Sequence, residues 1–401
     1  MTSTAHLMDL ENNYGAHIYS PLPLVLVRAK GIHAWDDHGK QYIDMMSAYS
    51  AVSHGHCHPK LVKVLQQQAE TLVVTSRSYY NDKLGLFLET LAKFSGYDQA
   101  IPMNTGVEAV ETALKAARKW AYKVKGVAEN KAEIIACTGN FHGRTIAVVG
   151  MSSDEQYRDG FGPFPAGFKL VEYGNSEALE AAITPNTAAF IVEPIQGEAG
   201  IFMPPAGYLR ACKTICEKHN VLFLADEIQC GLGRTGKRFA CDHEGVRPDG
   251  MILGKALGGG MLPVSAFLAD HAIMDVFHYG DHGSTFGGNA LSSVVATEAI
   301  RLLEDEKLAE NSAELGQYFM DELKKLTHPA IKEIRGKGLF IGLEIKQAHN
   351  WNARDFCLQL MEKGLLSKET HATVIRFAPP LVITKNQVDE ALIIIREVFT
   401  A

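Results

Sequence analysis

Short runs of consecutive apolar residues recur along the middle of the chain, separated by longer stretches with helical spacing. The runs predict strands at residues 132–137, 188–192, 221–225 and 251–253. Uninterrupted apolar runs are typical of strands buried on both faces, as in a mainly parallel sheet covered by helices. Helices are predicted at residues 59–72 and 107–124, where apolar side chains share one face. The pattern therefore indicates an α/β fold.

The pattern changes after about residue 291. Two long helical stretches, at residues 292–303 and 308–326, precede strands at 339–345 and 374–377 and a final helix at 385–399. A chain of 401 residues is also too long for one ordinary core. We therefore expect three parts: an N-terminal segment (1–50) packing with the small domain and the active site, a large domain (51–290) and a smaller α+β domain (291–401).

Composition narrows the class of protein. The chain is 46% hydrophobic and 21% charged with a net charge of −7, which describes a globular protein and disfavours nucleic acid as a partner. It has no apolar run long enough to span a membrane and no signal-peptide pattern at its start, so we expect a cytoplasmic location. The seven cysteines form no CxxC pair, and His54, His56 and His58 lack a second ligand cluster. Reduced thiols and no metal site are expected.

Two of the predicted strands end in polar groups that suit an aldehyde cofactor. Lys255 follows the strand at 251–253, where desolvation can lower the pKa of its amine for a Schiff base with pyridoxal phosphate. Asp226 follows the strand at 221–225 and could keep the cofactor's pyridine nitrogen protonated. Gln229, three residues after Asp226, could donate a hydrogen bond to the phenolic oxygen of the cofactor. The alternative is that Asp226 caps a helix and Lys255 is a solvated surface residue, the common state of both residue types.

Three further segments supply candidate cofactor contacts. Gly106 and Val107 open a predicted helix whose free amides could bind the phosphate, although Thr105 with Glu108 is equally a plain capping box. Thr285, in a glycine-rich turn, is a second candidate phosphate ligand. Phe141 follows a strand and could stack on the pyridine ring, although a core phenylalanine is the more common case.

These segments resemble the class III aminotransferases of the fold-type I pyridoxal phosphate family, over a match from Asn12 to the C-terminus. The family's long signature resembles residues 222–236 through 255–260. The resemblance implies a fold-type I transferase with a large domain built on a mainly parallel sheet and a smaller α+β C-terminal domain. It implies pyridoxal 5′-phosphate as cofactor and a homodimer in which Thr285 reaches the phosphate bound by the neighbouring subunit. It also implies the cofactor roles already given for Gly106, Val107, Phe141, Asp226, Gln229 and Lys255.

Within that family, residues 12–17, 47–52, 141–144 and 193–200 are most similar to the branch that acts on ornithine. The resemblance implies transfer of the δ-amino group of L-ornithine to 2-oxoglutarate. It also implies that Tyr19 and Arg144 hold the α-amino and α-carboxylate groups of ornithine, and that Tyr49 shapes the pocket beside the cofactor.

Glu198 and Arg376 are expected to act as a pair. A free arginine near the cofactor would bind an α-carboxylate and direct α-amino transfer, so Glu198 must cover Arg376 until 2-oxoglutarate displaces it. Charge-assisted contacts of about 1.5–3 kcal/mol make such an exchange reversible. The alternative is that both residues are ordinary surface charges.

Other functions remain open on the sequence alone. They are an acetylornithine or 4-aminobutyrate aminotransferase, a pyridoxal phosphate-dependent aminomutase or decarboxylase on the same fold, and a non-enzymatic binding protein.

Overall fold

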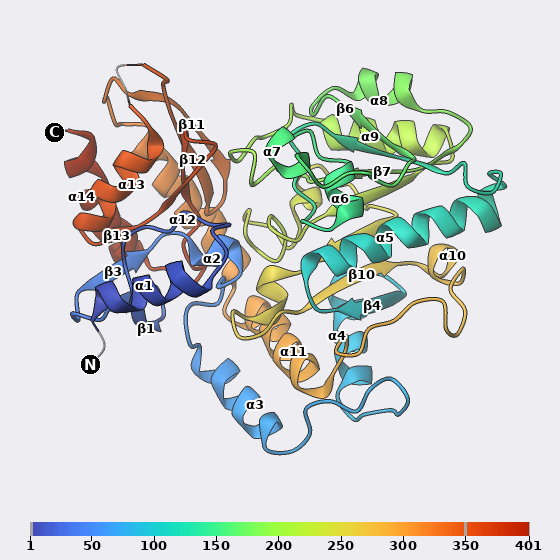
Figure 1. Cartoon of the computed structure of the whole chain (residues 1–401), viewed down its shortest axis with the longest axis horizontal. Coiled ribbons are helices and arrows are strands. Elements are labelled where there is room, and N and C mark those ends of the chain that lie inside the picture. Colours follow the sequence, from blue (N-terminus) through green and yellow to red (C-terminus); the bar gives the residue numbers. More distant parts are fainter. Residues whose placement is uncertain (1–2, 349–350, 401) are drawn as a thin grey trace.

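The four strands expected in the middle of the chain belong to a seven-stranded sheet in the computed structural model, which describes residues 3–348 and 351–400 (Figure 1). Only β10 runs antiparallel to its two neighbours, so the expected mainly parallel sheet is confirmed. In spatial order the strands are β4 (Gln99–Met103), β10 (Ser265–Ala269), β9 (Gly250–Leu253), β8 (Leu222–Asp226), β7 (Thr187–Val192), β5 (Glu133–Cys137) and β6 (Phe168–Val171).

Both faces of this sheet are buried, as the uninterrupted apolar runs predict. Strand β8 directs Leu222 and Leu224 to the face covered by α5 (Gly106–Trp120), and Phe223 and Ala225 to the face covered by α9 (Tyr208–Lys218). Alternate side chains of a strand point to opposite faces, so both sets must be apolar. The remaining helices of this lobe are α3 (Pro59–Ala69), α4 (Leu84–Ser95), α6 (Ile146–Gly150), α7 (Glu155–Arg158), α8 (Ser176–Ala182) and α10 (His271–Met274).

Strands β4, β6 and β10 were not expected from the apolar runs. Strand β4 contains Pro102, which removes a backbone donor and therefore disfavours a central strand, and it lies at one edge of the sheet. Strand β6 is only four residues long and lies at the other edge. Short edge strands carry too little hydrophobic pattern to be recognised without their neighbours.

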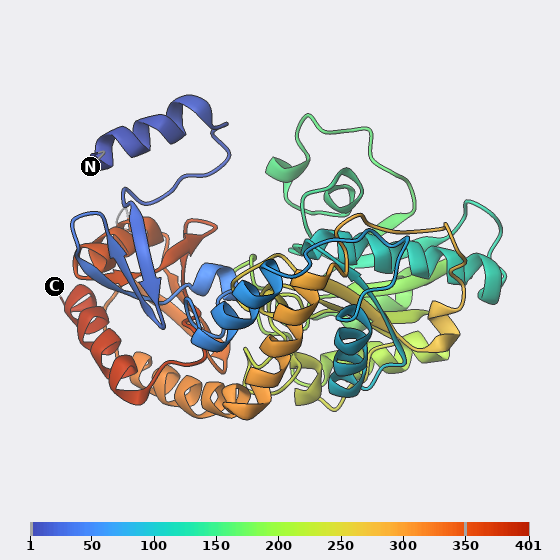
Figure 2. The same cartoon turned by 90° about the horizontal axis from the view of Figure 1, so that it is seen from below.

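The C-terminal residues form a second lobe around an antiparallel sheet with the order β11-β12-β15-β14. A third sheet joins β1, β2 and β3 to β13, which pairs in parallel with β3, so N-terminal and C-terminal segments lie side by side (Figures 1 and 2). The domain boundaries near residues 50 and 290 stay predictions. The strands are β1 (Leu26–Lys30), β2 (His33–Asp36), β3 (Gln41–Asp44), β11 (Ile331–Lys337), β12 (Phe340–Ile345), β13 (Leu365–Leu366), β14 (Lys368–Thr370) and β15 (Val374–Phe377). The helices are α1 (Thr4–Tyr14), α2 (Ser47–Ser50), α11 (Ala290–Asp305), α12 (Leu308–Leu323), α13 (Ala353–Glu362) and α14 (Lys385–Phe399).

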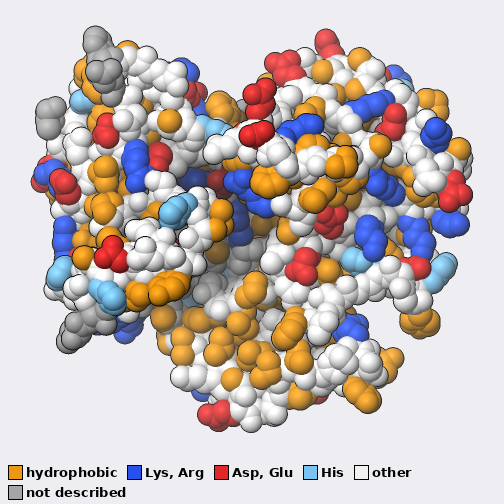
Figure 3. Space-filling model, viewed as in Figure 1, with side chains coloured by type: hydrophobic (Ala, Val, Ile, Leu, Met, Phe, Trp, Pro, Cys, Tyr) orange, Lys and Arg blue, Asp and Glu red, His pale blue; other side chains and the backbone are white. Residues whose placement is uncertain are grey.

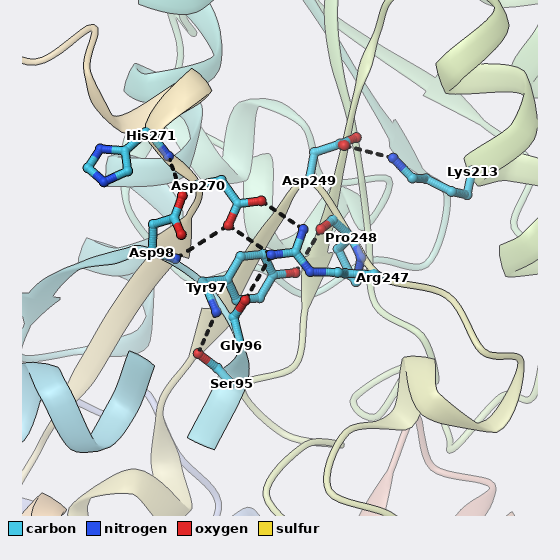
Figure 4. Close-up of polar contacts among 10 residues, drawn as sticks. All are labelled: Ser95, Gly96, Tyr97, Asp98, Lys213, Arg247, Pro248, Asp249, Asp270 and His271. Atoms are coloured by element: carbon cyan, nitrogen blue, oxygen red, sulfur yellow. Dashed lines mark hydrogen bonds and ion pairs between the residues drawn. The ribbon is translucent and has the colours of Figure 1, made fainter. Parts of the chain in front are cut away.

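A polar cluster joins β4, β9 and β10 at one end of the large sheet (Figure 4). Arg247 donates to both carboxylate oxygens of Asp270 at 2.8 Å and lies over the ring of Tyr97. Tyr97 in turn donates its hydroxyl to the carbonyl of Pro248 at 2.7 Å. The cluster fixes the end of these strands opposite to the one where β8 and β9 reach Asp226 and Lys255.

All seven cysteines are free. Among the helices of the described residues, none is long and apolar enough to cross a membrane.

Candidate active site

Lys255 and Asp226 meet at the carboxyl ends of two neighbouring strands. Because β8 and β9 pair in parallel, Asp226 at the end of β8 lies beside the residues that follow β9. Lys255 opens a short 3-10 turn with a left-handed φ of +43°, a conformation that a lysine adopts only when its surroundings hold it. Both side chains line one cavity of about 180 Å³, and burial lowers the pKa of Lys255. The alternative of a solvated surface lysine therefore does not hold.

His142 is a site residue that the sequence did not identify. Its Nδ1 lies 2.7 Å from Asp226 Oδ2, and both side chains are buried. Although burial opposes a charged ring, the Asp226 carboxylate raises the pKa of His142 above its ordinary value. Within the described residues His142 Nε2 has no hydrogen-bond partner. The pairing orients Asp226, whose other oxygen accepts from the amide of Ile228 at 3.1 Å.

Glu193 is a second residue that the sequence did not identify. It follows β7, and its carboxylate accepts hydrogen bonds from the amides of Phe141 at 2.9 Å and Gly197 at 3.4 Å. Burial raises the pKa of Glu193 to about 7. A signal existed, because a Glu-Pro pair directly after a buried strand resembles the polar strand ends that indicated Asp226 and Lys255. Glu193 thus joins the turn of Phe141 to the loop that carries Glu198.

The start of α5 carries the expected phosphate ligands. Glu108 does form the capping box, accepting from the amides of Thr105 at 2.6 Å and Asn104 at 3.1 Å. Gly106 and Val107 nevertheless line the cavity, and the first amides of a helix have no partner inside it. The capping box and an anion site are therefore compatible here, and the phosphate role stays a prediction.

Phe141 and Arg144 lie at the outer side of the cavity. Phe141 lines it, whereas the exposed Arg144 stacks on Tyr157, with 3.6 Å between the guanidinium carbon and the ring centre. Tyr157 belongs to α7 and was not expected from the sequence. The arrangement places a cation beside Phe141, and Figure 3 shows Lys and Arg side chains in the hollow between the two lobes.

Glu198 and Arg376 form the expected pair. Arg376 donates from Nη1 to Glu198 Oε1 at 2.7 Å, and Gln229 donates its side-chain amide to the same oxygen at 2.9 Å. Arg376 is only 2% exposed, so it is not an ordinary surface charge. Burial would raise the pKa of Glu198, but Arg376 and Lys255 hold it at about 2. Glu198 is therefore an anion next to Lys255, and the cofactor contact expected of Gln229 stays a prediction.

Tyr49 lies in a left-handed turn of four residues other than glycine. The φ angles of residues 47–50 are 42°, 47°, 60° and 72°. Asp44 supports the turn by accepting from the amides of Met46 at 2.8 Å and Ser47 at 3.0 Å. The guanidinium of Arg376 lies over the Tyr49 ring, 4.8 Å from its centre. The turn thus brings Tyr49 to the Glu198–Arg376 pair.

The expected site residues divide into two groups. Those that line the cavity are Gly106, Val107, Phe141, Glu198, Asp226, Gln229 and Lys255, with Arg376 and Tyr49 directly behind Glu198. Tyr19, Arg144 and Thr285 are exposed and are not among the residues that line it. Tyr19 is 80% exposed but lies close enough to Tyr49 to contribute, after burial and Glu198, to the raised pKa of Tyr49.

The residues around the cavity fit the pyridoxal phosphate expected from the sequence. They provide a buried amine, an anion oriented by a histidine, and helix-start amides. Gln229 Oε1 and Arg376 Nε are buried and, among the described residues, lack a hydrogen-bond partner. No group of three or more His, Cys, Asp or Glu in the described part of the chain is placed to hold a metal ion.

Comparison with known proteins identifies the family. The model of the class-III aminotransferases matches residues 14–399. The chain belongs to the class-III aminotransferases. Ornithine aminotransferase of Bacillus subtilis (strain 168) is 57% identical over 392 residues, which cover 98% of this chain and 97% of the relative.

Solved structures of other aminotransferases share the fold over the whole chain. Ornithine aminotransferase of Toxoplasma gondii superposes with a TM-score of 0.98 at 43% identity, covering 100% of this chain and 94% of its own, and that structure has PLP at partial occupancy in its active site. Acetylornithine aminotransferase of Elizabethkingia anophelis superposes with a TM-score of 0.91 at 47% identity, covering 100% of both chains. The expected fold-type I architecture is confirmed.

Proposed function

We propose that this class-III aminotransferase moves the δ-amino group of L-ornithine to 2-oxoglutarate, giving L-glutamate 5-semialdehyde and L-glutamate in a ping-pong reaction. The observation that carries the proposal is the Glu198–Arg376 ion pair next to Lys255. The full-length similarity to the ornithine aminotransferase of Bacillus subtilis supports the same substrate.

Pyridoxal phosphate, when bound, supplies an aldehyde that accepts the amine and a ring that withdraws electrons from the carbon losing a proton. Lys255 would hold its aldehyde carbon, Asp226 its ring nitrogen, Gln229 its phenolic oxygen, and Phe141 one face of its ring. The amides of Gly106 and Val107 would hold the phosphate.

Once the δ-amine of ornithine has taken its place at the aldehyde carbon, the freed amine of Lys255 acts as the base that removes a proton from Cδ of ornithine. Burial lowers the pKa of its amine, so the neutral form that accepts a proton is more accessible than it is for a solvated lysine. His142 keeps the Asp226 carboxylate in place by a 2.7 Å contact. A fixed anion at this position keeps the electron-withdrawing ring protonated without movement of the protein during the reaction.

The choice of the δ-amino group follows from which arginine is available. Glu198 occupies Arg376, so the α-carboxylate of ornithine is directed to the exposed Arg144 at the mouth, with Tyr19 near the α-amino group. The distal amine then reaches Lys255. 2-Oxoglutarate carries two carboxylates, and it displaces Glu198 from Arg376 with one while Arg144 binds the other.

A homodimer is part of the proposal. Phe286, next to Thr285, is exposed, and the carbonyl of Val73 accepts from the amide of Leu291 at 3.4 Å, which brings the segment of Val73 to the start of the helix that follows this turn. Val73, Tyr79, Tyr80 and Leu86 are also exposed. A second copy of the chain would cover them and bring Thr285 to the phosphate of the other subunit. Sedimentation should give a mass of at least two chains, and a monomer would contradict this part. The cytoplasmic location stays a prediction.

The reaction is tested with purified protein, L-ornithine and 2-oxoglutarate, by trapping the cyclised semialdehyde. Lys255→Ala should lower kcat by about 10³-fold because the base is lost, whereas Lys123→Ala, at an exposed position, should leave it unchanged. Turnover without added keto acid would instead indicate an aminomutase or a decarboxylase.

Substrate preference separates the nearest alternatives. The Elizabethkingia structure makes acetylornithine the main competitor, and 4-aminobutyrate is the other. A higher kcat/KM for either than for ornithine would overturn the proposed substrate.

A further inference from the structure

The loop that carries Glu198 is a tight hairpin with a strained corner. Gln196 and Phe202 exchange two backbone hydrogen bonds, of 3.1 and 2.9 Å, which close the loop. Directly before Phe202, Ile201 has a φ of +56°, which is unfavourable for a β-branched residue. Such a conformation persists only where neighbouring groups hold the backbone. The amide of Ile201 donates to the carbonyl of Gly197 within the loop at 3.2 Å, and side chains of the C-terminal lobe supply the other contacts.

Three residues of the C-terminal sheet form a row beneath this loop. Arg335 on β11 pairs in register with Gly342 on β12, which pairs in register with Arg376 on β15. Residues directly opposite on neighbouring strands point to the same face of the sheet. A Cβ at Gly342 would lie 3.1 Å from the carbonyl oxygen of Gly200, so the loop rests directly on the middle of the row. The two arginines flank it.

Arg335 holds the strained corner. It donates from Nη2 and Nε to the carbonyl of Gly200, at 2.8 and 3.2 Å, and from Nε to the carbonyl of Ile201 at 3.1 Å. Its side chain is 8% exposed, and Glu344 on the neighbouring strand accepts its Nη1. Thr370, also in the C-terminal lobe, donates to the backbone carbonyl of Glu198 itself at 2.6 Å. The backbone from Glu198 to Ile201 is therefore held from the sheet that carries Arg376.

We propose that Arg335 is a positioning residue that holds Glu198 on Arg376 and so helps to decide which amino group of the substrate is transferred. Arg376 can bind either Glu198 or the α-carboxylate of a substrate, and the outcome depends on how closely Glu198 is kept in place. A loop released from Arg335 gives Glu198 more positions away from Arg376, which favours the substrate carboxylate. This inference rests on the proposed function, because it concerns the selectivity of the same site.

The test compares the half-reactions of ornithine and glutamate on the cofactor-loaded protein, followed by the absorbance of the bound cofactor. Arg335→Lys keeps the charge next to Glu344 but cannot donate to both carbonyls. The ratio of kcat/KM for ornithine to that for glutamate should fall by about tenfold, the effect of losing roughly one charge-assisted hydrogen bond. The fall should come mainly from a lower KM for glutamate. Lys332→Met is the matched control, because Lys332 contacts Glu344 at 2.6 Å from the same strand.

Two further variants separate positioning from a general structural effect. In a Glu198→Gln background, Arg335→Lys should no longer change the ratio, since the group that it positions has lost its charge. If Arg335→Lys does not fold, the Gly342→Ala variant tests the proposal in its place. The added Cβ pushes on the carbonyl of Gly200 and should lower the ratio of kcat/KM for ornithine to that for glutamate.

The outcomes distinguish the two proposals. A wild-type protein that does not prefer ornithine to glutamate overturns the proposed function. A wild-type protein that does prefer ornithine, together with an Arg335→Lys ratio equal to that of Lys332→Met, overturns the role of Arg335 alone. An equal effect of Arg335→Lys with and without Glu198→Gln also overturns that role.

Discussion

At the scale of single residues, the buried Glu193 and the partly buried Glu198 have opposite protonation tendencies. Burial raises the pKa of Glu193 to about 7. The negative charge of Asp226 acts in the same direction, and the backbone amides that Glu193 accepts from do not outweigh these two effects. Burial acts on Glu198 too, but Arg376 and Lys255 outweigh it and hold the pKa at about 2. The same residue type is therefore an anion in one position and close to neutral in the other, according to the cations that tertiary structure provides.

The raised pKa of Glu193 predicts a pH-dependent stability. The unfolded chain loses this proton near the ordinary value of 4.5, whereas the folded protein keeps it until about 7. Between these values the folded state binds more protons, so the contribution is present below about pH 4.5 and is lost as the pH rises through 7. Glu193→Gln cannot ionise, and its stability relative to wild type should increase with pH by up to about 3 kcal/mol. Urea unfolding at pH 5 and pH 8 measures this, and a difference independent of pH would contradict it.

At the scale of elements, α2 is a left-handed turn built without glycine. Residues other than glycine lose roughly 1 kcal/mol or more in this conformation, so the surroundings of the turn must stabilise it. The Asp44 carboxylate supports its first amides, and Ser47 donates its hydroxyl to the carbonyl of Ala378 at 2.6 Å. The turn holds Tyr49 against Arg376 at the expense of local stability, as is common near functional sites.

Two alanines in and next to this turn give a matched prediction. Ala48 has a φ of 47° and a ψ of 53°, so Ala48→Gly should stabilise the protein by up to about 1 kcal/mol. Ala51 has a φ of −75° and a ψ of −32°, so Ala51→Gly should destabilise it by about 0.5–1 kcal/mol. Thermal unfolding of both variants measures the difference. Equal shifts of Tm would show that strain in α2 does not affect stability.

At the scale of the whole molecule, one buried arginine joins three parts of the chain. Arg234, in the loop after β8, donates to the carbonyls of Leu339 at 3.0 Å and Pro379 at 2.6 Å in the C-terminal lobe. It also donates to the hydroxyls of Ser47 at 3.2 Å and Ser53 at 2.9 Å, on either side of the turn of Tyr49. Burial lowers the pKa of Arg234 to about 9. The two carbonyl and two hydroxyl oxygens that accept from Arg234 are neutral, so they stabilise its buried positive charge only if all four are kept in place.

Arg234→Lys should therefore destabilise the protein by about 2–3 kcal/mol, because a lysine cannot reach all four oxygens and leaves buried carbonyls without donors. Arg238→Lys, in the same loop, is the control. Arg238 is partly exposed and contacts the Phe94 carbonyl and Glu304, so its substitution should change stability by less than about 0.5 kcal/mol. Urea unfolding at constant pH measures both, and similar effects would show that Arg234 has no special part in joining the lobes.

The sequence by itself determined the elements and the residues at strand ends. Largely apolar runs identified β5, β7, β8 and β9, since burial on both faces leaves few polar positions in such strands. Lys255 and Asp226 could be paired because they follow two strands that are close in the chain and joined by one crossover. The local pattern of apolar and polar residues is enough to pair two site residues when they lie on consecutive strands of the sheet.

Only the tertiary structure decided the contacts between distant segments. His142 meets Asp226 across 84 residues, and Arg335 meets Gly200 across 135. Such contacts depend on strand order and register, which a local pattern of apolar and polar residues does not specify. The exposed positions of Tyr19, Arg144 and Thr285, and the burial of Arg234 and Arg376, follow from the same packing. The strand ends supply the reactive groups, and the packing of the C-terminal lobe determines how those groups are oriented and charged.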